Sequence, residues 1–209
     1  NAFRAFAMAE QNISGPMHVF EGKFGWYRSH IQTTDERHYN HITTDLPGED
    51  WKVLEIASKQ YPAAYNLLPH IEATITLRDR YGVKPEDVAH IDAYIARETF
   101  QNLCEPRAVK IRPANSWHGR ISLQHSIAEA LVTGKMDKNA YALSHINDAR
   151  INTVASKVYH HADPGGDPNR CGAKVVIRLH DGRELSHEIR DFIGTPNNPL
   201  RTDDYLRKF

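Results

Sequence analysis

A lysine and a histidine flank the start of a largely apolar stretch, "SKQYPAAYNLLPHIEATITLRDRYG", at residues 58–82. Lys59 precedes a Tyr-Pro turn, and His70 stands where helical spacing of apolar residues begins. A hydrophobic core needs neither side chain there. An ammonium group and an imidazole near a helix start are suited to holding a carboxylate and carrying a proton. The pattern indicates a site for small anions, with a surface lysine and a backbone-bonded histidine as the alternatives.

Other groups of residues resemble metal or phosphate sites but lack the required spacing. His160 and His161 are adjacent on an expected strand, where neighbouring side chains point to opposite faces and cannot reach one ion. The 13 histidines include no HExxH spacing. Cys104 and Cys171 are too few for an iron–sulfur cluster. The glycine-rich "DPGGDP" at 163–168 lacks the Lys-Ser/Thr of a phosphate loop and is interpreted as a turn. We therefore expect no metal and no cofactor.

Composition narrows the possible partners. The 209 residues are 25% charged and 40% hydrophobic, which is typical of a globular protein with a sizeable core. The formal net charge is zero and the basic residues are spread evenly, so nucleic acid is not an expected partner. The sequence has no apolar run of roughly 18 residues, the minimum for a membrane helix. We expect a cytoplasmic protein that binds neither nucleic acid nor membrane.

Apolar periodicity predicts helices and strands that alternate through residues 51–191. Strands are expected near 51–58, 88–99, 173–180 and 183–190, and helices near 67–81, 121–133 and 147–158. Asp181-Gly182 joins the last two strands as a hairpin. Residues 30–50 are polar and irregular, which is typical of a long surface loop. The predicted fold class is α+β, an antiparallel sheet with helices packed on one face.

The ends of the predicted helices carry stop and start signals. Gly134 follows the helix near 121–133 and is expected to end it. Asn147 or Asp148 is expected to cap the helix near 147–158, which then runs into a short strand. The chain opens inside an apolar helical pattern that contains Phe3 and Phe6, and it closes on a barely begun helix. We expect both ends to be cuts through a longer polypeptide, with a processed or tagged terminus as the alternative.

Four stretches, in the same order over nearly the whole chain, resemble the MmgE/PrpD family. "SKQYPAAYNLLPHIEATITLRDRYGVKPEDVAHI" is similar to the family's Lys-x-Tyr-Pro strand end, the helix that follows it and a Pro-x-Asp turn. The other three are "GPMHVFEGKFG", "ISLQHSIAEALVTGK" and "GTPNNPLRTDDYLRKF". No single stretch is specific, but the four in sequence identify the chain as a member of the family.

The resemblance implies a domain organisation. Family members are longer proteins with a large helical domain and a smaller α+β lid. Residues 1–50 would be the end of the helical domain and a connecting loop, 51–191 the lid, and 192–209 a return segment toward the helical domain. The first half of the family's sequence, which supplies an Asp and a His to the site, would not be part of these residues.

The resemblance also implies roles for particular side chains. Lys59 and His70 match the family's lysine and histidine and are expected to be catalytic. Arg120, Gln124 and His125 are expected to bind substrate, although the family usually has Tyr where this chain has His125. The substrates would be small di- or tricarboxylates, handled without a cofactor, and a homodimer is expected.

Three functions remain open at the level of sequence. The first is a segment of a 2-methylcitrate-dehydratase-like hydro-lyase. The second is an epimerase of the iminodisuccinate type or a decarboxylase of the cis-aconitate type on the same fold. The third is a lid-only chain with a structural or regulatory role and no catalysis.

Overall fold

The computed structural model describes residues 2–20, 22–23, 25–30, 52–164 and 171–208, which divide into two compact units. The units are Asn1–Lys52 and Val53–Phe209, and each is described by itself. The smaller unit contains α1 (Ala2–Glu10) and α2 (Trp26–His30). Its α1 has no buried residue. The ring of the buried Tyr27 packs against Phe20, with 5.6 Å between the ring centroids.

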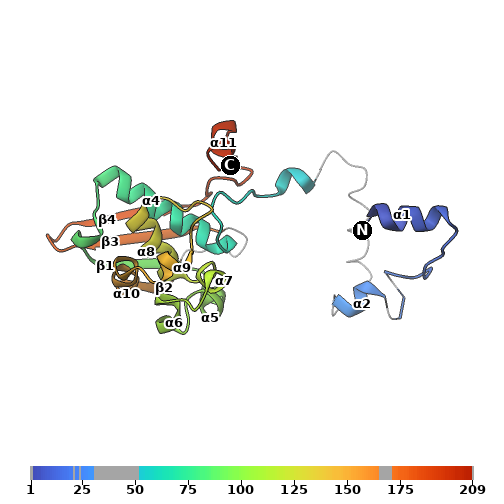
Figure 1. Cartoon of the computed structure of the whole chain (residues 1–209), viewed down its shortest axis with the longest axis horizontal. Coiled ribbons are helices and arrows are strands. Elements are labelled where there is room, and N and C mark those ends of the chain that lie inside the picture. The colour runs from blue at the N-terminus through green and yellow to red at the C-terminus, as the bar shows by residue number, and fades with distance from the viewer. Residues whose placement is uncertain (1, 21, 24, 31–51, 165–170, 209) are drawn as a thin grey trace. The chain divides into compact units, whose positions relative to one another are not determined.

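The larger unit is built on a four-stranded mixed sheet (Figure 1). Its strands are β1 (Val88–Ile95), β2 (Val158–Ala162), β3 (Ala173–Leu179) and β4 (Glu184–Ile189), in the order β2-β1-β3-β4. The β1–β3 and β3–β4 pairs are antiparallel, and β1 pairs with β2 in parallel. The predicted α+β fold is confirmed, and the predicted antiparallel pairing holds for β1–β3 and β3–β4 but not for the parallel β1–β2 pair. A long helical crossover separates β1 from β2, and such a connection returns the chain in the same direction.

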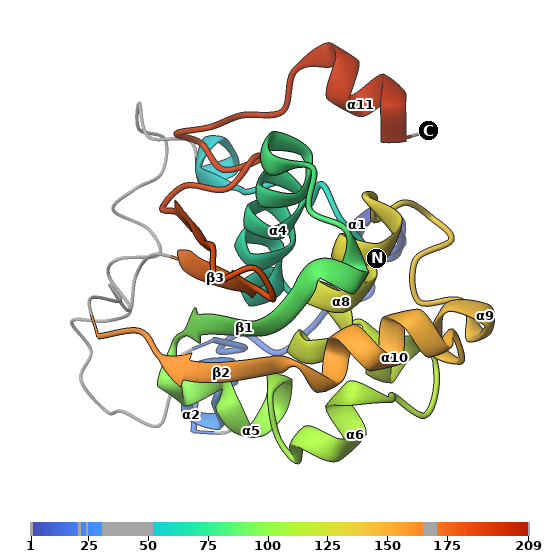
Figure 2. The same ribbon diagram turned by 90° about the vertical axis from the view of Figure 1, so that its left-hand side faces the viewer.

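Three longer helices form the layer beside the sheet. They are α4 (Leu68–Tyr81), α8 (Leu123–Thr133) and α10 (Ala149–Ser156), close to the predicted ranges. Helix α4 contacts β3, β4 and α8, and α10 contacts α8. Figure 2 shows α4 and α8 next to each other, with β1 running past both. Each helix contributes fully buried aliphatic side chains to one core, whose burial is the main favourable term in folding.

Short helical turns complete the larger unit. Those before β1 are η1 (Lys52–Glu55), η2 (Tyr65–Leu67) and η3 (Pro85–Asp87). Those between β1 and α10 are η4 (Arg97–Thr99), α5 (Phe100–Leu103), α6 (Arg107–Ile111), α7 (Ser116–Gly119) and α9 (Leu143–Ile146). The last described element is α11 (Thr202–Lys208). Among the described helices, none combines the length and apolar character needed to cross a membrane.

Strand alternation gives the sheet one apolar and one polar face. On β1, Ile91, Ala93 and Ile95 are buried in the core, and the residues between them are Asp92 and Tyr94. Successive strand residues point to opposite sides, so Asp92 and Tyr94 lie on the face away from that core. The second face is therefore polar along β1.

Local signals in the sequence are confirmed at three element ends. The β3–β4 hairpin turns at Asp181-Gly182, where Gly182 has a φ of 87°. Gly134 ends α8 in a left-handed conformation. Asp148 caps α10 by accepting a hydrogen bond from the backbone N–H of Arg150. These features depend on a few neighbouring residues, which is why a sequence pattern can predict them.

The strand predicted near 51–58 is wrong for the part that the structure describes. Residues Lys52–Glu55 form a 3-10 turn, and the chain that follows is irregular. The Ser58 N–H donates to the Gly194 carbonyl at 2.7 Å, in a loop contact outside the sheet. Leu54 and Ile56 are exposed, so the apolar alternation there does not mark a buried strand face. The loop predicted at 30–50 lies outside the described residues from position 31 on, and the turn predicted at 163–168 lies outside them from position 165 on.

Candidate functional site

Lys59 and Arg120 are bound to the two ends of one peptide group. The Lys59 Nζ donates to the Ala63 carbonyl at 3.2 Å, and the Ala64 N–H donates to the Arg120 carbonyl at 2.8 Å. The Ala63 carbonyl and the Ala64 N–H belong to the same peptide bond. Both Lys59 and Arg120 are exposed. The fold thus brings the backbone of one cation and the ammonium group of another to a single short loop, although 61 positions separate them in sequence.

The chain around Arg120 follows from α7 and from the start of α8. Asn115 caps α7 by accepting a hydrogen bond from the backbone N–H of His118. The buried Lys110 donates to the carbonyls of Asn102 and Ile121, at 2.5 and 2.8 Å. Burial lowers the pKa of Lys110 from its usual value. Sequence analysis missed this lysine, which binds the carbonyl of Ile121, the residue directly after Arg120.

His70 lies at the start of α4 and is completely buried. Its Nδ1 is 3.0 Å from the Asn66 carbonyl oxygen, and its Nε2 is 2.9 Å from that of Tyr94 on β1. Burial lowers the pKa of His70 to about 4, against the opposing effect of the two carbonyls. A neutral imidazole carries a single N–H, so one of the carbonyls accepts a hydrogen bond. This geometry matches the backbone-bonded alternative, while the catalytic role of His70 stays a prediction.

Gln124 is buried in the first turn of α8, and its side chain faces into the protein. Its Nε2 donates to the Cys104 carbonyl at 3.2 Å. Its Oε1 has no hydrogen-bond partner among the residues that the structure describes. Gln124 therefore joins α8 to the end of α5, and its role in substrate binding stays a prediction.

His125 belongs to a buried polar network centred on Glu129. The Nε2 of His125 lies 3.2 Å from one Glu129 oxygen, and the Nδ1 of His145 lies 2.7 Å from the other. The Tyr141 N–H donates to the same carboxylate at 3.1 Å, and the Tyr141 hydroxyl lies 2.9 Å from the Ser126 Oγ. Burial raises the pKa of Glu129, but the two imidazoles and the backbone donor outweigh it, so the net shift is downward.

The Glu129 network reaches the candidate site through Tyr141. A Cβ placed on Gly119, directly before Arg120, would lie 2.8 Å from Tyr141 Cδ1, so the tyrosine ring packs closely on this glycine. Sequence analysis missed Glu129, although an acidic residue on an apolar helix face four positions after a histidine was an available signal. The network therefore places His125 behind Arg120, in the core.

A second carboxylate cluster lies on the polar face of the sheet. The Nε2 atoms of His90 and His161 are 2.9 and 2.6 Å from one oxygen of Asp92, and Arg178 binds the other oxygen. His160 instead contacts Glu105 at 3.3 Å and the ring of Phe100. The two adjacent histidines therefore meet different partners, as strand geometry predicts. In the parts of the chain that are described, no three His, Cys, Asp or Glu side chains are grouped as a metal ion requires.

The fold and these contacts define an α+β domain with the Lys59 ammonium and the Arg120 backbone at one loop, a buried network around Glu129, and an Asp92 cluster on the polar face of the sheet. A family model described as the MmgE/PrpD C-terminal domain matches residues 61–209. The chain therefore belongs to the MmgE/PrpD family, which includes lyases of the dehydratase type. A search of curated proteins finds none that matches.

Proposed function

We propose that this chain is the lid segment of a cofactor-independent hydro-lyase of the 2-methylcitrate dehydratase type. Its substrate is a small di- or tricarboxylate. The observation that supports the proposal is that the Lys59 ammonium and the backbone carbonyl of the exposed Arg120 both bind the Ala63–Ala64 peptide group, in a chain of the MmgE/PrpD family. Two cations at one loop suit a substrate that carries more than one carboxylate.

The proposed chemistry explains why fixed cations are needed. In a dehydration, a base removes a proton from the carbon next to a carboxylate, a C=C bond forms, and the neighbouring hydroxyl leaves as water after taking up a proton. Negative charge develops on the carboxylate during this step. Lys59 and Arg120 stabilise it by charge-assisted hydrogen bonds, and no metal is required. The ammonium and guanidinium groups also orient the substrate.

The buried candidates have supporting roles in this proposal. Gln124 and His125 hold the first turn of α8, and the Tyr141 ring packs on Gly119 beside Arg120. His70 lies between the carbonyls of Asn66 and of Tyr94 on β1, one of which accepts its single N–H. We propose that His70, Gln124 and His125 act by holding in place the backbone around Lys59 and Arg120. We also propose that the protein is a homodimer. We propose a reducing compartment such as the cytoplasm because Cys104 and Cys171 are both free.

Replacing Lys59 with Ala tests the proposal in the full-length native protein. The change removes a charge-assisted contact to a carboxylate, worth on the order of 1.5–3 kcal/mol. That energy corresponds to a loss in kcat/KM of about 10- to 150-fold on 2-methylcitrate. The melting temperature changes little, because an exposed lysine contributes little core packing.

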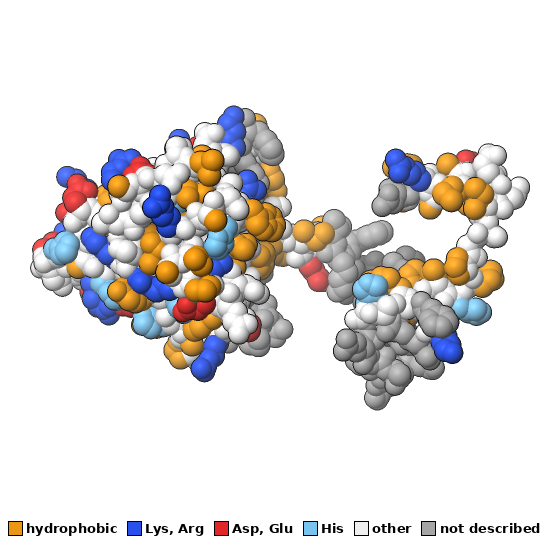
Figure 3. Space-filling view, turned by 60° about the horizontal axis from the view of Figure 1, so that its bottom comes forward, with side chains coloured by type: hydrophobic (Ala, Val, Ile, Leu, Met, Phe, Trp, Pro, Cys, Tyr) orange, Lys and Arg blue, Asp and Glu red, His pale blue; other side chains and the backbone are white. Residues whose placement is uncertain are grey.

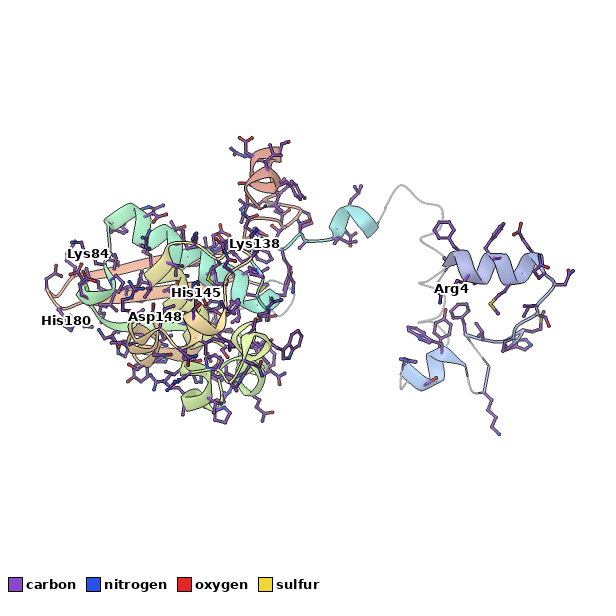
Figure 4. All side chains as sticks on the ribbon, viewed as in Figure 1. Arg4, Lys84, Lys138, His145, Asp148 and His180 are labelled. Atoms are coloured by element: carbon purple, nitrogen blue, oxygen red, sulfur yellow. The ribbon has the colours of Figure 1, made fainter. Side chains whose placement is uncertain are left out.

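Lys84→Ala is the matched control. Lys84 is an exposed lysine in the α4–β1 connection, which meets the β3–β4 hairpin through a hydrogen bond from the His180 N–H to the Asp87 carbonyl (Figure 4). Its removal leaves kcat/KM unchanged. An unchanged kcat/KM for Lys59→Ala would make Lys59 an ordinary surface lysine, and a collapsed melt would make it structural. Turnover of cis-aconitate or iminodisuccinate in place of 2-methylcitrate would contradict the dehydratase assignment.

A further inference from the structure

The turn at residues 191–198 is hydrogen-bonded to the backbone of Ser58, directly before Lys59. The Ser58 N–H donates to the Gly194 carbonyl at 2.7 Å, and the Gly194 N–H donates to the Asn198 carbonyl at 2.7 Å. The Tyr205 hydroxyl of α11 lies 3.5 Å from the Ser58 Oγ. Ser58 and Gly194 are 136 positions apart in sequence, so this contact belongs to the tertiary fold.

Gly194 has no room for a side chain. Its φ is +106°, a conformation that L-residues with a Cβ rarely adopt. A Cβ built on Gly194 would also overlap with the carbonyl oxygen of Ser58. This neighbour is backbone, so it cannot rotate away as a flexible side chain would. Any larger residue must push the Ser58 peptide, and Lys59 with it, out of position.

The turn is itself anchored to the core. The Ile193 N–H donates to the Glu72 Oε2 of α4 at 2.8 Å. Phe192 is buried, and the edge of its ring meets Tyr65 with 5.1 Å between centroids. The Asn198 Nδ2 donates to the Asp191 carbonyl at 3.1 Å and closes the turn. The turn is thus tied to α4 and to the core, and a rigid support of this kind can fix a neighbouring segment.

Lys59 is held on both sides. Its backbone follows the residue that Gly194 grips, and its ammonium group binds the Ala63 carbonyl in the loop next to Arg120. We propose that Gly194 is a positioning residue for Lys59: by holding the Ser58 peptide, it fixes where the ammonium group meets a substrate carboxylate. The functional half of this statement rests on the proposed carboxylate site.

Gly194→Ala tests whether Gly194 holds the Ser58 peptide, with Gly182→Ala as the matched control. Gly182 also has a positive φ, of 87°, but a Cβ there meets nothing within 4 Å. The control therefore carries the backbone strain without the collision. Amide hydrogen exchange of Ser58 in the full-length protein is the first readout, because its N–H is the donor to Gly194. Exchange at Ser58 becomes roughly tenfold faster or more in Gly194→Ala and stays unchanged in Gly182→Ala.

Turnover of 2-methylcitrate is the second readout, and it separates positioning from general damage. Gly194→Ala lowers kcat/KM by roughly tenfold in the parent protein. In a Lys59→Ala background the same change lowers it no further, because the side chain that Gly194 positions is already gone. A loss of equal size in both backgrounds would overturn the proposal.

Two further results keep the test decisive. If Gly194→Ala does not fold, Glu72→Ala provides a second test, because it removes the acceptor of the Ile193 N–H without a steric collision. Amide exchange at Ser58 becomes faster in Glu72→Ala. It returns to the parent rate in Glu72→Gln, which keeps an acceptor for the Ile193 N–H. A folded Gly194→Ala protein with normal exchange at Ser58 would overturn the proposal. Full activity of Lys59→Ala would instead refute the carboxylate site. The exchange rate of the Ser58 amide would then be the test of whether Gly194 holds the Ser58 peptide in place.

Discussion

His70 illustrates how burial changes the meaning of a residue type. A histidine near a helix start is suited to proton transfer because its ordinary pKa lies close to neutral pH. In this fold the imidazole is enclosed between the carbonyls of Asn66 and Tyr94 and has no exposed surface. Desolvation favours the neutral form, and the pKa falls to about 4. At neutral pH His70 therefore acts as an uncharged link between α4 and β1.

The low pKa of His70 predicts that stability falls as the pH falls. The unfolded chain binds a proton near pH 6.5 and the folded protein near pH 4, so the contribution is fully present above 6.5 and is lost between these values. The total is on the order of 3–4 kcal/mol, because the folded pKa of about 4 lies far below the usual 6.5. Urea unfolding across this pH range measures it.

His70→Gln gives the comparison for that measurement. Glutamine keeps one N–H donor for a backbone carbonyl but does not titrate. We expect a flatter dependence of the unfolding free energy on pH than in the parent protein. Between pH 6.5 and pH 4 the unfolding free energy of the parent should fall more than that of His70→Gln. Equal slopes would show that His70 does not hold the low pKa.

At the scale of elements, the crossover between β1 and β2 decides the sheet topology. Helix α10 leads directly into β2, so the position of this helix fixes where the edge strand enters the sheet. The Arg107 guanidinium binds the carbonyls of Ser156 and Val158, the last residue of α10 and the first of β2. Arg107 therefore stabilises the junction between the end of α10 and the start of β2.

Asp148 at the start of α10 gives a prediction at this scale. Its carboxylate accepts from the Arg150 N–H at 2.8 Å and pairs with the Arg150 guanidinium at 2.7 Å. The bond from the Arg150 side chain lowers the pKa of Asp148 to about 2, so the cap is charged at neutral pH. Asp148→Ala destabilises the protein by about 1 kcal/mol in urea unfolding.

Asp148→Asn is the control for this substitution. Asparagine keeps an oxygen that can accept the backbone N–H, and it ranks with aspartate as an N-cap residue. Most of the stability should therefore return. If the Ala and Asn variants were equally destabilised, the loss would come from the pair with Arg150 and not from the cap.

At the scale of the molecule, the large hydrophobic cluster formed by the described residues belongs to the unit Val53–Phe209. Its buried cluster extends from Ala63 to Phe192 and joins the sheet to α4, α8 and α10. On one face of this unit, basic, acidic and histidine side chains are interspersed among apolar ones (Figure 3). This distribution agrees with a formal net charge of zero.

A chain that begins at Val53 should fold by itself, because the described residues of the cluster all belong to the unit Val53–Phe209. We expect a cooperative thermal transition with a midpoint close to that of the longer chain. Amide resonances of the core strands should superimpose in the two proteins. Loss of cooperativity would mean that residues 1–52 contribute to the core.

The sequence by itself determined the elements whose causes are local. The hairpin at Asp181-Gly182, the end of α8 at Gly134 and the cap of α10 at Asp148 each depend on a few neighbouring residues. Four stretches in order also determined the family, which the match to residues 61–209 confirms.

The tertiary structure alone decided the partners of each segment and the burial of the candidate residues. Residues 52–58 alternate like a strand, but Ser58 is bonded to Gly194 and not to a neighbouring strand. The parallel β1–β2 pair depends on where a long crossover ends. His125 is in the core, whereas Arg120 is exposed. Contacts between residues far apart in sequence are set by packing and by the need to pair every buried polar group, and no local pattern encodes them.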